Sequence, residues 1–183
     1  MAGATLILAL DASLSLGGLR MGSVYTNTLE LIESIEDWKT AVIGDILFIG
    51  TGDNGDGCEW LCGSMKRFGD IHDAIEGEFM AMGHTALLES LCAIGDRLSS
   101  EKAGGESVVL FLTDGEFGFL TPEEISAAVE ENIPGCTCAV LLVGYAYDEE
   151  AVMALASSRD LVFKEYQQNA MMERLKEICG GRR

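Results

Sequence analysis

Short apolar runs that end at turns constrain the fold of this chain more than any other feature. Residues 4–10 are almost wholly apolar and stop at Asp11. A continuous apolar run, unlike an alternating one, is typical of a parallel strand that helices cover on both faces. Residues 107–112 and 138–143 form similar runs. The sequence therefore predicts a buried, mostly parallel sheet.

Segments with a helical spacing of apolar residues separate these runs. In residues 85–98, five leucine and isoleucine side chains fall on one stripe of a helix. Further helices are expected at residues 23–38, 66–79, 170–179, and from 122 and 149 onward, and further strands at 41–49, 59–62 and 161–164. This alternation predicts a three-layer, doubly wound α/β fold with right-handed crossovers.

The domain organisation follows from the same pattern. The turn-rich residues 50–57 between two strand-like segments predict a hairpin, and hence an antiparallel strand at one edge of the sheet. No internal repeat or linker interrupts the alternation of elements. We therefore expect residues 1–183 to form a single domain.

The charge balance excludes several classes of partner. The chain has 30 acidic and 12 basic residues among 183, which gives a formal net charge of -18. Such a surface repels nucleic acids and anionic membrane leaflets, so neither is an expected partner. The apolar segment 4–10 is too short to span a membrane and has no basic residue before it, unlike a signal peptide. A cytoplasmic protein is expected.

Six cysteines fit no recognised disulfide framework, and we expect them to be reduced. A zinc site made of Cys58, Cys62, Cys136 and Cys138 is the alternative. Neither pair has the two-residue spacing usual in zinc sites, so zinc ligation is not expected.

Polar residues follow two of the buried runs. Asp11, Ser13 and Ser15 lie in the segment DASLS after the first run, and Asp114 lies in TDG after a later one. Thr85 opens a helix after a loop that contains glycine. Ligands of such sheets bind at the carboxyl ends of the strands, where these residues are expected to meet. Two carboxylates and three hydroxyls form an oxygen-only set that suits a hard cation such as Mg²⁺.

These three elements resemble the metal-ion-dependent adhesion site (MIDAS) of von Willebrand factor A domains, and the order of strands and helices resembles that fold over nearly the whole chain. The resemblance implies that Ser13, Ser15 and Thr85 supply hydroxyl oxygens to the metal. Asp11 and Asp114 would act directly or through water. An open sixth position would accept an Asp or Glu of a partner protein. Mn²⁺ and Ca²⁺ are the alternatives to Mg²⁺.

The resemblance also implies a class of function. Stand-alone intracellular domains of this type often accompany MoxR-like AAA ATPases or kinase-phosphatase systems, so it implies an adaptor or regulatory subunit and not an enzyme. One departure concerns the rim of the site, where His84 replaces the small residue that is common before the threonine. This bulkier side chain affects the shape of the rim, and hence the choice of ligand.

Two other functions stay open. The first is a Mg²⁺-dependent hydrolase that uses Asp11 as a nucleophile, as haloacid-dehalogenase-like phosphatases do. Such enzymes carry a second Asp two positions later, where this chain has Ser13, which cannot act as an acid or base near neutral pH. The second is a structural subunit of an assembly with no metal-dependent ligand.

Overall fold

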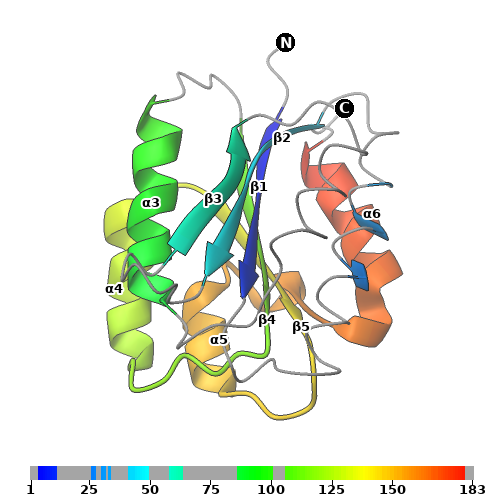
Figure 1. Cartoon of the computed structure of the whole chain (residues 1–183). Coiled ribbons are helices and arrows are strands. Elements are labelled where there is room, and N and C mark those ends of the chain that lie inside the picture. The colour runs from blue at the N-terminus through cyan, green and yellow to red at the C-terminus, as the bar shows by residue number, and fades with distance from the viewer. Residues whose placement is uncertain are drawn as a thin grey trace.

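A six-stranded sheet forms the centre of the part of the chain that the structure describes, in the order β3-β2-β1-β4-β5-β6 (Figure 1). This computed structural model describes residues 4–11, 26–27, 30–31, 33, 41–49, 58–63, 86–100 and 106–179. The strands are β1 (Ala4–Asp11), β2 (Ala41–Ile49), β3 (Cys58–Gly63), β4 (Ser107–Thr113), β5 (Thr137–Leu142) and β6 (Val162–Lys164). All neighbouring pairs are parallel except β2 and β3, which are antiparallel.

Helices cover both faces of this sheet. Helices α3 (Leu87–Ser100), α4 (Pro122–Asn132) and α5 (Glu149–Leu155) lie on one side, and α6 (Gln168–Cys179) lies on the other (Figure 1). Two short 3-10 helices, η2 (Arg159–Leu161) and η3 (Glu165–Gln167), flank β6. The architecture is the three-layer α/β fold with an antiparallel edge strand that the sequence predicts.

The start of α4 shows how local sequence sets an element. Thr121 caps the helix: its hydroxyl accepts a hydrogen bond from the backbone N–H of Glu124. The Glu124 carboxylate in turn accepts one from the N–H of Thr121 at 2.8 Å. Pro122 occupies the first turn, where its missing N–H costs nothing. This reciprocal capping fixes the boundary at the proline that predicts it.

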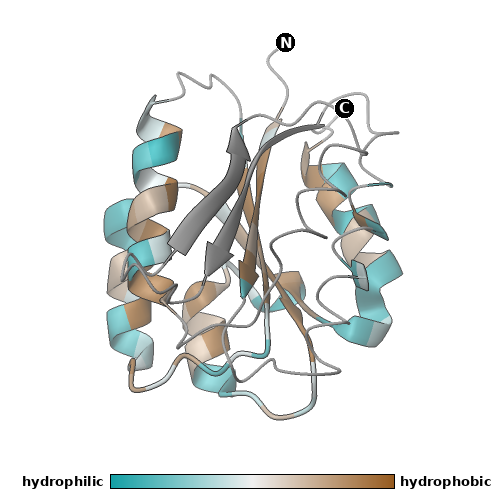
Figure 2. Ribbon diagram, in the orientation of Figure 1, coloured by the Kyte–Doolittle hydropathy of each residue, from teal (hydrophilic) through white to brown (hydrophobic). Residues whose placement is uncertain are grey.

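Burial on both faces of the sheet explains the continuous apolar run of β1. On β1, side chains that point to either face are buried, with Leu6, Leu8 and Leu10 fully so and Ile7 1% exposed. Ile7 and Phe111 belong to a cluster that α3, α4 and α5 cover. Figure 2 shows the resulting apolar colour along the central strands, with hydrophilic residues on the outer faces of the helices. Burial on both faces removes any need for alternation.

Most predicted elements are confirmed within the described residues. The predicted helix 85–98 corresponds to α3, which begins and ends two residues later, and the run 138–143 corresponds to β5, which begins and ends one residue earlier. Residues 26–27, 30–31 and 33 of the predicted helix 23–38 are helical. The predicted helix 66–79 lies outside the described residues, and the single-domain organisation stays a prediction. Of the helices in the described ranges, none is long and apolar enough to cross a membrane.

Helices α3 and α4 approach closely at Gly95, and this predicts an unusual effect of an alanine there. A Cβ atom at Gly95 would overlap the backbone carbonyl oxygen of Asn132. Gly→Ala in a helix usually gains about 1 kcal/mol, whereas overpacking costs about 1–3 kcal/mol. Because the overlapping atom belongs to the backbone and cannot rotate away, we expect Gly95→Ala to lower the free energy of unfolding by about 1–2 kcal/mol. Urea denaturation measures it.

The matched control for Gly95→Ala is Ser99→Ala on an exposed position of the same helix. This change alters helix propensity without creating a contact, so it is expected to leave stability equal or slightly higher. A Gly95→Ala variant as stable as Ser99→Ala would show that the close approach of the two helices carries no energetic constraint.

Candidate functional site

The two aspartates predicted for the site lie at the ends of adjacent strands. Asp11 is the last residue of β1, and Asp114 directly follows β4. The two strands are parallel neighbours, with Leu10 opposite Leu112, so their carboxyl ends meet at the lower edge of the sheet in Figure 1. Both aspartates are buried, Asp11 fully and Asp114 with 1% exposure. The structure therefore brings together the two carboxylates that the sequence places after separate strands.

Thr113 connects the two strand ends. Its hydroxyl donates a hydrogen bond of 2.6 Å to Oδ2 of Asp11 and accepts one of 3.0 Å from the backbone N–H of Gly115. Since a hydroxyl has a single proton, that proton points at the Asp11 carboxylate. The short distance is typical of a hydrogen bond to a charged oxygen. Thr113 thus holds one oxygen of Asp11 in place and leaves the carboxylate as an acceptor.

Sequence patterns alone do not single out Thr113. A threonine at the end of an apolar strand looks like an ordinary strand residue, because threonine is common in strands. The only available signal is its place in TDG, one residue before Asp114 and at the strand end beside Asp11. Thr113 is a positioning residue of the candidate site.

The loop after β4 has a conformation that only glycine adopts readily at its centre. Gly115 has a φ of 76°, in the left-handed region. A Cβ atom there would lie 2.8 Å from Cβ of Tyr147 and 2.9 Å from Cγ2 of Val152. Oδ1 of Asp114 accepts a hydrogen bond of 3.1 Å from the N–H of Glu116, which closes a tight turn. These contacts fix the position of Asp114 at the rim.

The other predicted ligands lie outside the described residues. This applies to Ser13, Ser15 and Thr85, and also to His84. Their contact with a metal stays a prediction. The donor chemistry on the described side of the site fits a hard divalent cation, because adjacent strand ends present two carboxylates and no nitrogen or sulfur donor from these positions.

The alternative zinc site is not compatible with the topology. The Cys58/Cys62 pair belongs to β3, whereas Cys138 belongs to β5, and three strands lie between them. At about 4.8 Å per strand, the two strands are about 19 Å apart, far beyond the reach of ligands of one zinc ion. Burial raises the pKa of Cys138 to about 12, so its thiol keeps its proton near neutral pH. Within the described ranges, no three His, Cys, Asp or Glu residues are grouped to hold a metal.

The hydrogen bond from Thr113 to Asp11 predicts the effect of an isosteric change. Thr113→Val keeps the shape but removes the donor to Asp11 and the acceptor for the N–H of Gly115. Leaving buried polar groups without their partners costs about 1–3 kcal/mol. We expect Thr113→Val to lower the free energy of unfolding by that amount in urea denaturation. Thr113→Ser, which keeps the hydroxyl, should recover most of the loss, and equal losses in both variants would contradict a role for the hydroxyl.

The comparisons with known proteins identify the fold. No known protein-family profile and no curated protein matches the sequence. Among solved structures, proximal thread matrix protein 1 from the mussel byssus has a TM-score of 0.71 at 20% identity, over 97% of this chain and 46% of that one. A von Willebrand factor type A protein from Catenulispora acidiphila has a TM-score of 0.73 at 16% identity, over 96% and 42%.

A third similar structure has the same extent as this chain. The conserved hypothetical protein BatB from Bacteroides thetaiotaomicron has a TM-score of 0.70 at 15% identity, over 98% of this chain and 100% of its own. This chain therefore spans less than half of the mussel and Catenulispora chains but all of BatB. The mussel protein has also been solved with zinc in its MIDAS motif. Together with the topology and the paired aspartates, these similarities show that the chain has the fold of a von Willebrand factor A domain.

Proposed function

We propose that this chain is a protein-binding module that depends on a divalent metal. Asp11, Ser13, Ser15, Thr85 and Asp114 would hold Mg²⁺, and a carboxylate of a partner protein would complete its coordination. The observation that carries the proposal is the pair of buried carboxylates at the ends of the adjacent strands β1 and β4, with Asp11 held by the hydroxyl of Thr113. In this fold, that edge of the sheet is where ligands bind.

Charge explains why such a site would bind a carboxylate. Two carboxylates only balance the formal charge of the metal, and the neutral hydroxyl ligands and the open position would leave it electrophilic. An incoming Asp or Glu therefore gains a charge-assisted contact, although the chain as a whole has a net charge of -18. Residues around the site orient its two carboxylates: Thr113 orients Asp11, and the turn at Gly115 orients Asp114.

The mussel protein with zinc in its MIDAS motif supports metal binding at this place in the fold. The oxygen-only donor set favours Mg²⁺ for this chain, with Mn²⁺ and Ca²⁺ as alternatives. Ser13 stands two positions after Asp11, where hydrolases of this kind carry an acid or base, and its hydroxyl cannot do that work near neutral pH, which favours binding over catalysis. The proposal thus assigns no enzymatic activity.

The partner and the setting extend the proposal beyond the site. A cytoplasmic adaptor or regulatory subunit, acting beside a MoxR-like AAA ATPase or a kinase-phosphatase system, agrees with the resemblance and with the acidic composition. Such a partner would present one acidic side chain to the metal and basic residues around it, because the surface that it meets is acidic.

Water-proton relaxation with Mn²⁺ tests both parts of the proposal. Chelator-stripped protein is first titrated with Mn²⁺, which relaxes water protons strongly when bound water exchanges at an open position. N-acetyl-glutamate methylamide is then added, and we expect it to lower the relaxation enhancement by displacing that water. The control is N-acetyl-glutamine methylamide, which has nearly the same shape but no charge and should have little effect. Absence of metal binding, or equal effects of the two compounds, would favour the structural subunit.

A further inference from the structure

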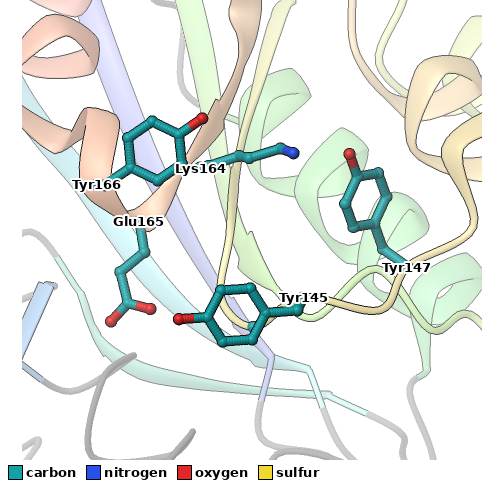
Figure 3. A pocket seen from close by; sticks show the side chains of 6 residues that line it. Tyr145, Tyr147, Lys164, Glu165 and Tyr166 are labelled. Atoms are coloured by element: carbon teal, nitrogen blue, oxygen red, sulfur yellow. The ribbon is translucent and has the colours of Figure 1, made fainter.

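A cavity of about 320 Å³ lies on the same edge of the sheet as the two aspartates. The segment after β5 forms one wall, and the end of β6 with η3 forms the other. Its lining consists of Gly144, Tyr145, Tyr147, Lys164, Glu165 and Tyr166 (Figure 3). None of these residues belongs to the metal site proposed above.

Aromatic side chains dominate this cavity. Three of the four tyrosines of the chain line it. Tyr145 is 100% exposed and Tyr166 is 81% exposed. Exposed aromatic residues gathered on one edge are typical of a surface that binds a ligand or another protein.

The cavity already contains one cation from the chain itself. The Nζ atom of Lys164 lies 5.6 Å from the centroid of the Tyr147 ring, and Figure 3 shows its side chain extending among the tyrosines. The face of an aromatic ring is electronegative and attracts cations within about 6 Å. The contact therefore shows that this wall of the cavity accommodates a positively charged group.

The charges around the cavity favour a further cation over an anion. Glu165 is part of the lining, and Asp148 and Glu150 follow the Tyr147 wall at the start of α5. Lys164 is the single basic residue in the lining. An incoming anion would meet this acidic surround. An incoming guanidinium could stack on the exposed tyrosines and pair with Glu165, which suits its planar shape.

We infer that this cavity binds the guanidinium of an arginine side chain. The identity of its biological carrier rests on the proposed function: the arginine would belong to the same partner that offers a carboxylate to the metal. Two contacts at Gly115 join the cavity to the loop that carries Asp114. Tyr147 packs against Gly115, and the N–H of Asp148 donates to the carbonyl oxygen of Gly115 at 3.4 Å. A partner segment that carries both an arginine and an acidic residue fits this edge.

The test uses the full chain in chelator, so that it is independent of any metal. N-acetyl-arginine methylamide is titrated while the ring signals of the tyrosines are followed by NMR. We expect saturable shifts of the Tyr145 and Tyr166 signals. N-acetyl-glutamine methylamide and inorganic phosphate are the control probes and should not shift them. If arginine binds but no carboxylate binds through the metal, the cavity assignment stands and the proposed function fails. If a carboxylate binds through the metal but arginine does not bind, the proposed function stands and the cavity assignment fails.

Substitutions in the lining distinguish a cation site from an anion site, because they change the affinity for arginine in opposite directions. Tyr145→Ala and Tyr166→Ala should each weaken arginine binding about two- to fivefold, as expected for one cation–π contact. Glu165→Gln should weaken it as well. Lys164→Met should strengthen it, because the change removes the competing ammonium. Phe119→Ala, an exposed aromatic residue outside the lining, is the control and should leave the affinity unchanged.

Two outcomes would overturn the inference. The first is equal response to the arginine and glutamine compounds, which would show that the cavity does not recognise the charge. The second is binding of phosphate that Lys164→Met abolishes, which would make the cavity an anion site.

Discussion

Asp11→Asn is expected to lower the affinity for Mg²⁺ about 100-fold or more without unfolding the protein. The change removes one of the two carboxylate charges at the site. The attraction between two unit charges about 4 Å apart near a protein surface is about 4 kcal/mol. A net loss of only half that energy lowers the affinity by a factor of tens, and the loss is larger for a divalent ion. The asparagine side chain has the same size, and its carbonyl oxygen can still accept the hydrogen bond from Thr113. Isothermal titration calorimetry of chelator-stripped protein measures the loss.

The control for Asp11→Asn is Glu116→Gln, which removes an equal charge from an exposed residue in the loop after β4. If the metal responds only to the general negative field, both variants will weaken binding alike. If Asp11 is a ligand or holds a metal-bound water, Glu116→Gln should change the affinity less than about threefold, since exposed charges are screened. Circular dichroism checks that both variants remain folded. Full Mg²⁺ affinity in Asp11→Asn would remove the metal-site assignment.

The fold is largely predictable because burial leaves a direct mark on the sequence. The run 4–10 is continuously apolar since both faces of β1 are covered, and Pro122 marks the start of α4 because it suits only the first turn. The order of the strands is harder to predict. Nothing in the periodicity of β1 indicates that β2 and β4 flank it, because that choice depends on the packing of helices far apart in the sequence. The start of α6 also differs from the predicted residue 170, because η3 leads directly into it.

The candidate site is predictable only in part, for a related reason. Asp11 and Asp114 each follow an apolar run, which is a local signal. The role of Thr113 depends on the register of β1 with β4, which no local pattern contains. The arginine cavity is still less visible, because Tyr145 and Tyr147 are nearly twenty residues from Lys164 and Tyr166, and the parallel pairing of β5 with β6 brings them together. Contacts between distant segments are therefore what sequence reasoning misses here.

Phe111→Ala is expected to cause the largest loss of stability, about 3–5 kcal/mol. Phe111 is 1% exposed in the middle strand β4, between Ala9 of β1 and Val140 of β5. Its ring lies in the cluster under α3, α4 and α5, so truncation leaves a cavity that three helices cannot fill by a local shift. Since the free energy of unfolding of a domain is about 5–15 kcal/mol, a loss of this size is a large fraction of it. Urea denaturation measures it.

Phe119→Ala is the matched control for Phe111→Ala, because it removes the same side chain from a fully exposed position. Its expected effect is within about 0.5 kcal/mol, and equal losses in the two variants would contradict the assigned core.

Metal binding connects the stability of Phe111→Ala with the Mg²⁺ affinity that Asp11→Asn lowers. A ligand that binds only the folded state, at a hundred times its dissociation constant, stabilises by about 2.7 kcal/mol. Saturating Mg²⁺ should therefore restore much of the stability lost in Phe111→Ala, and it should fail to do so when Asp11→Asn is added, because the double variant keeps the fold but lacks the carboxylate through which the metal would act.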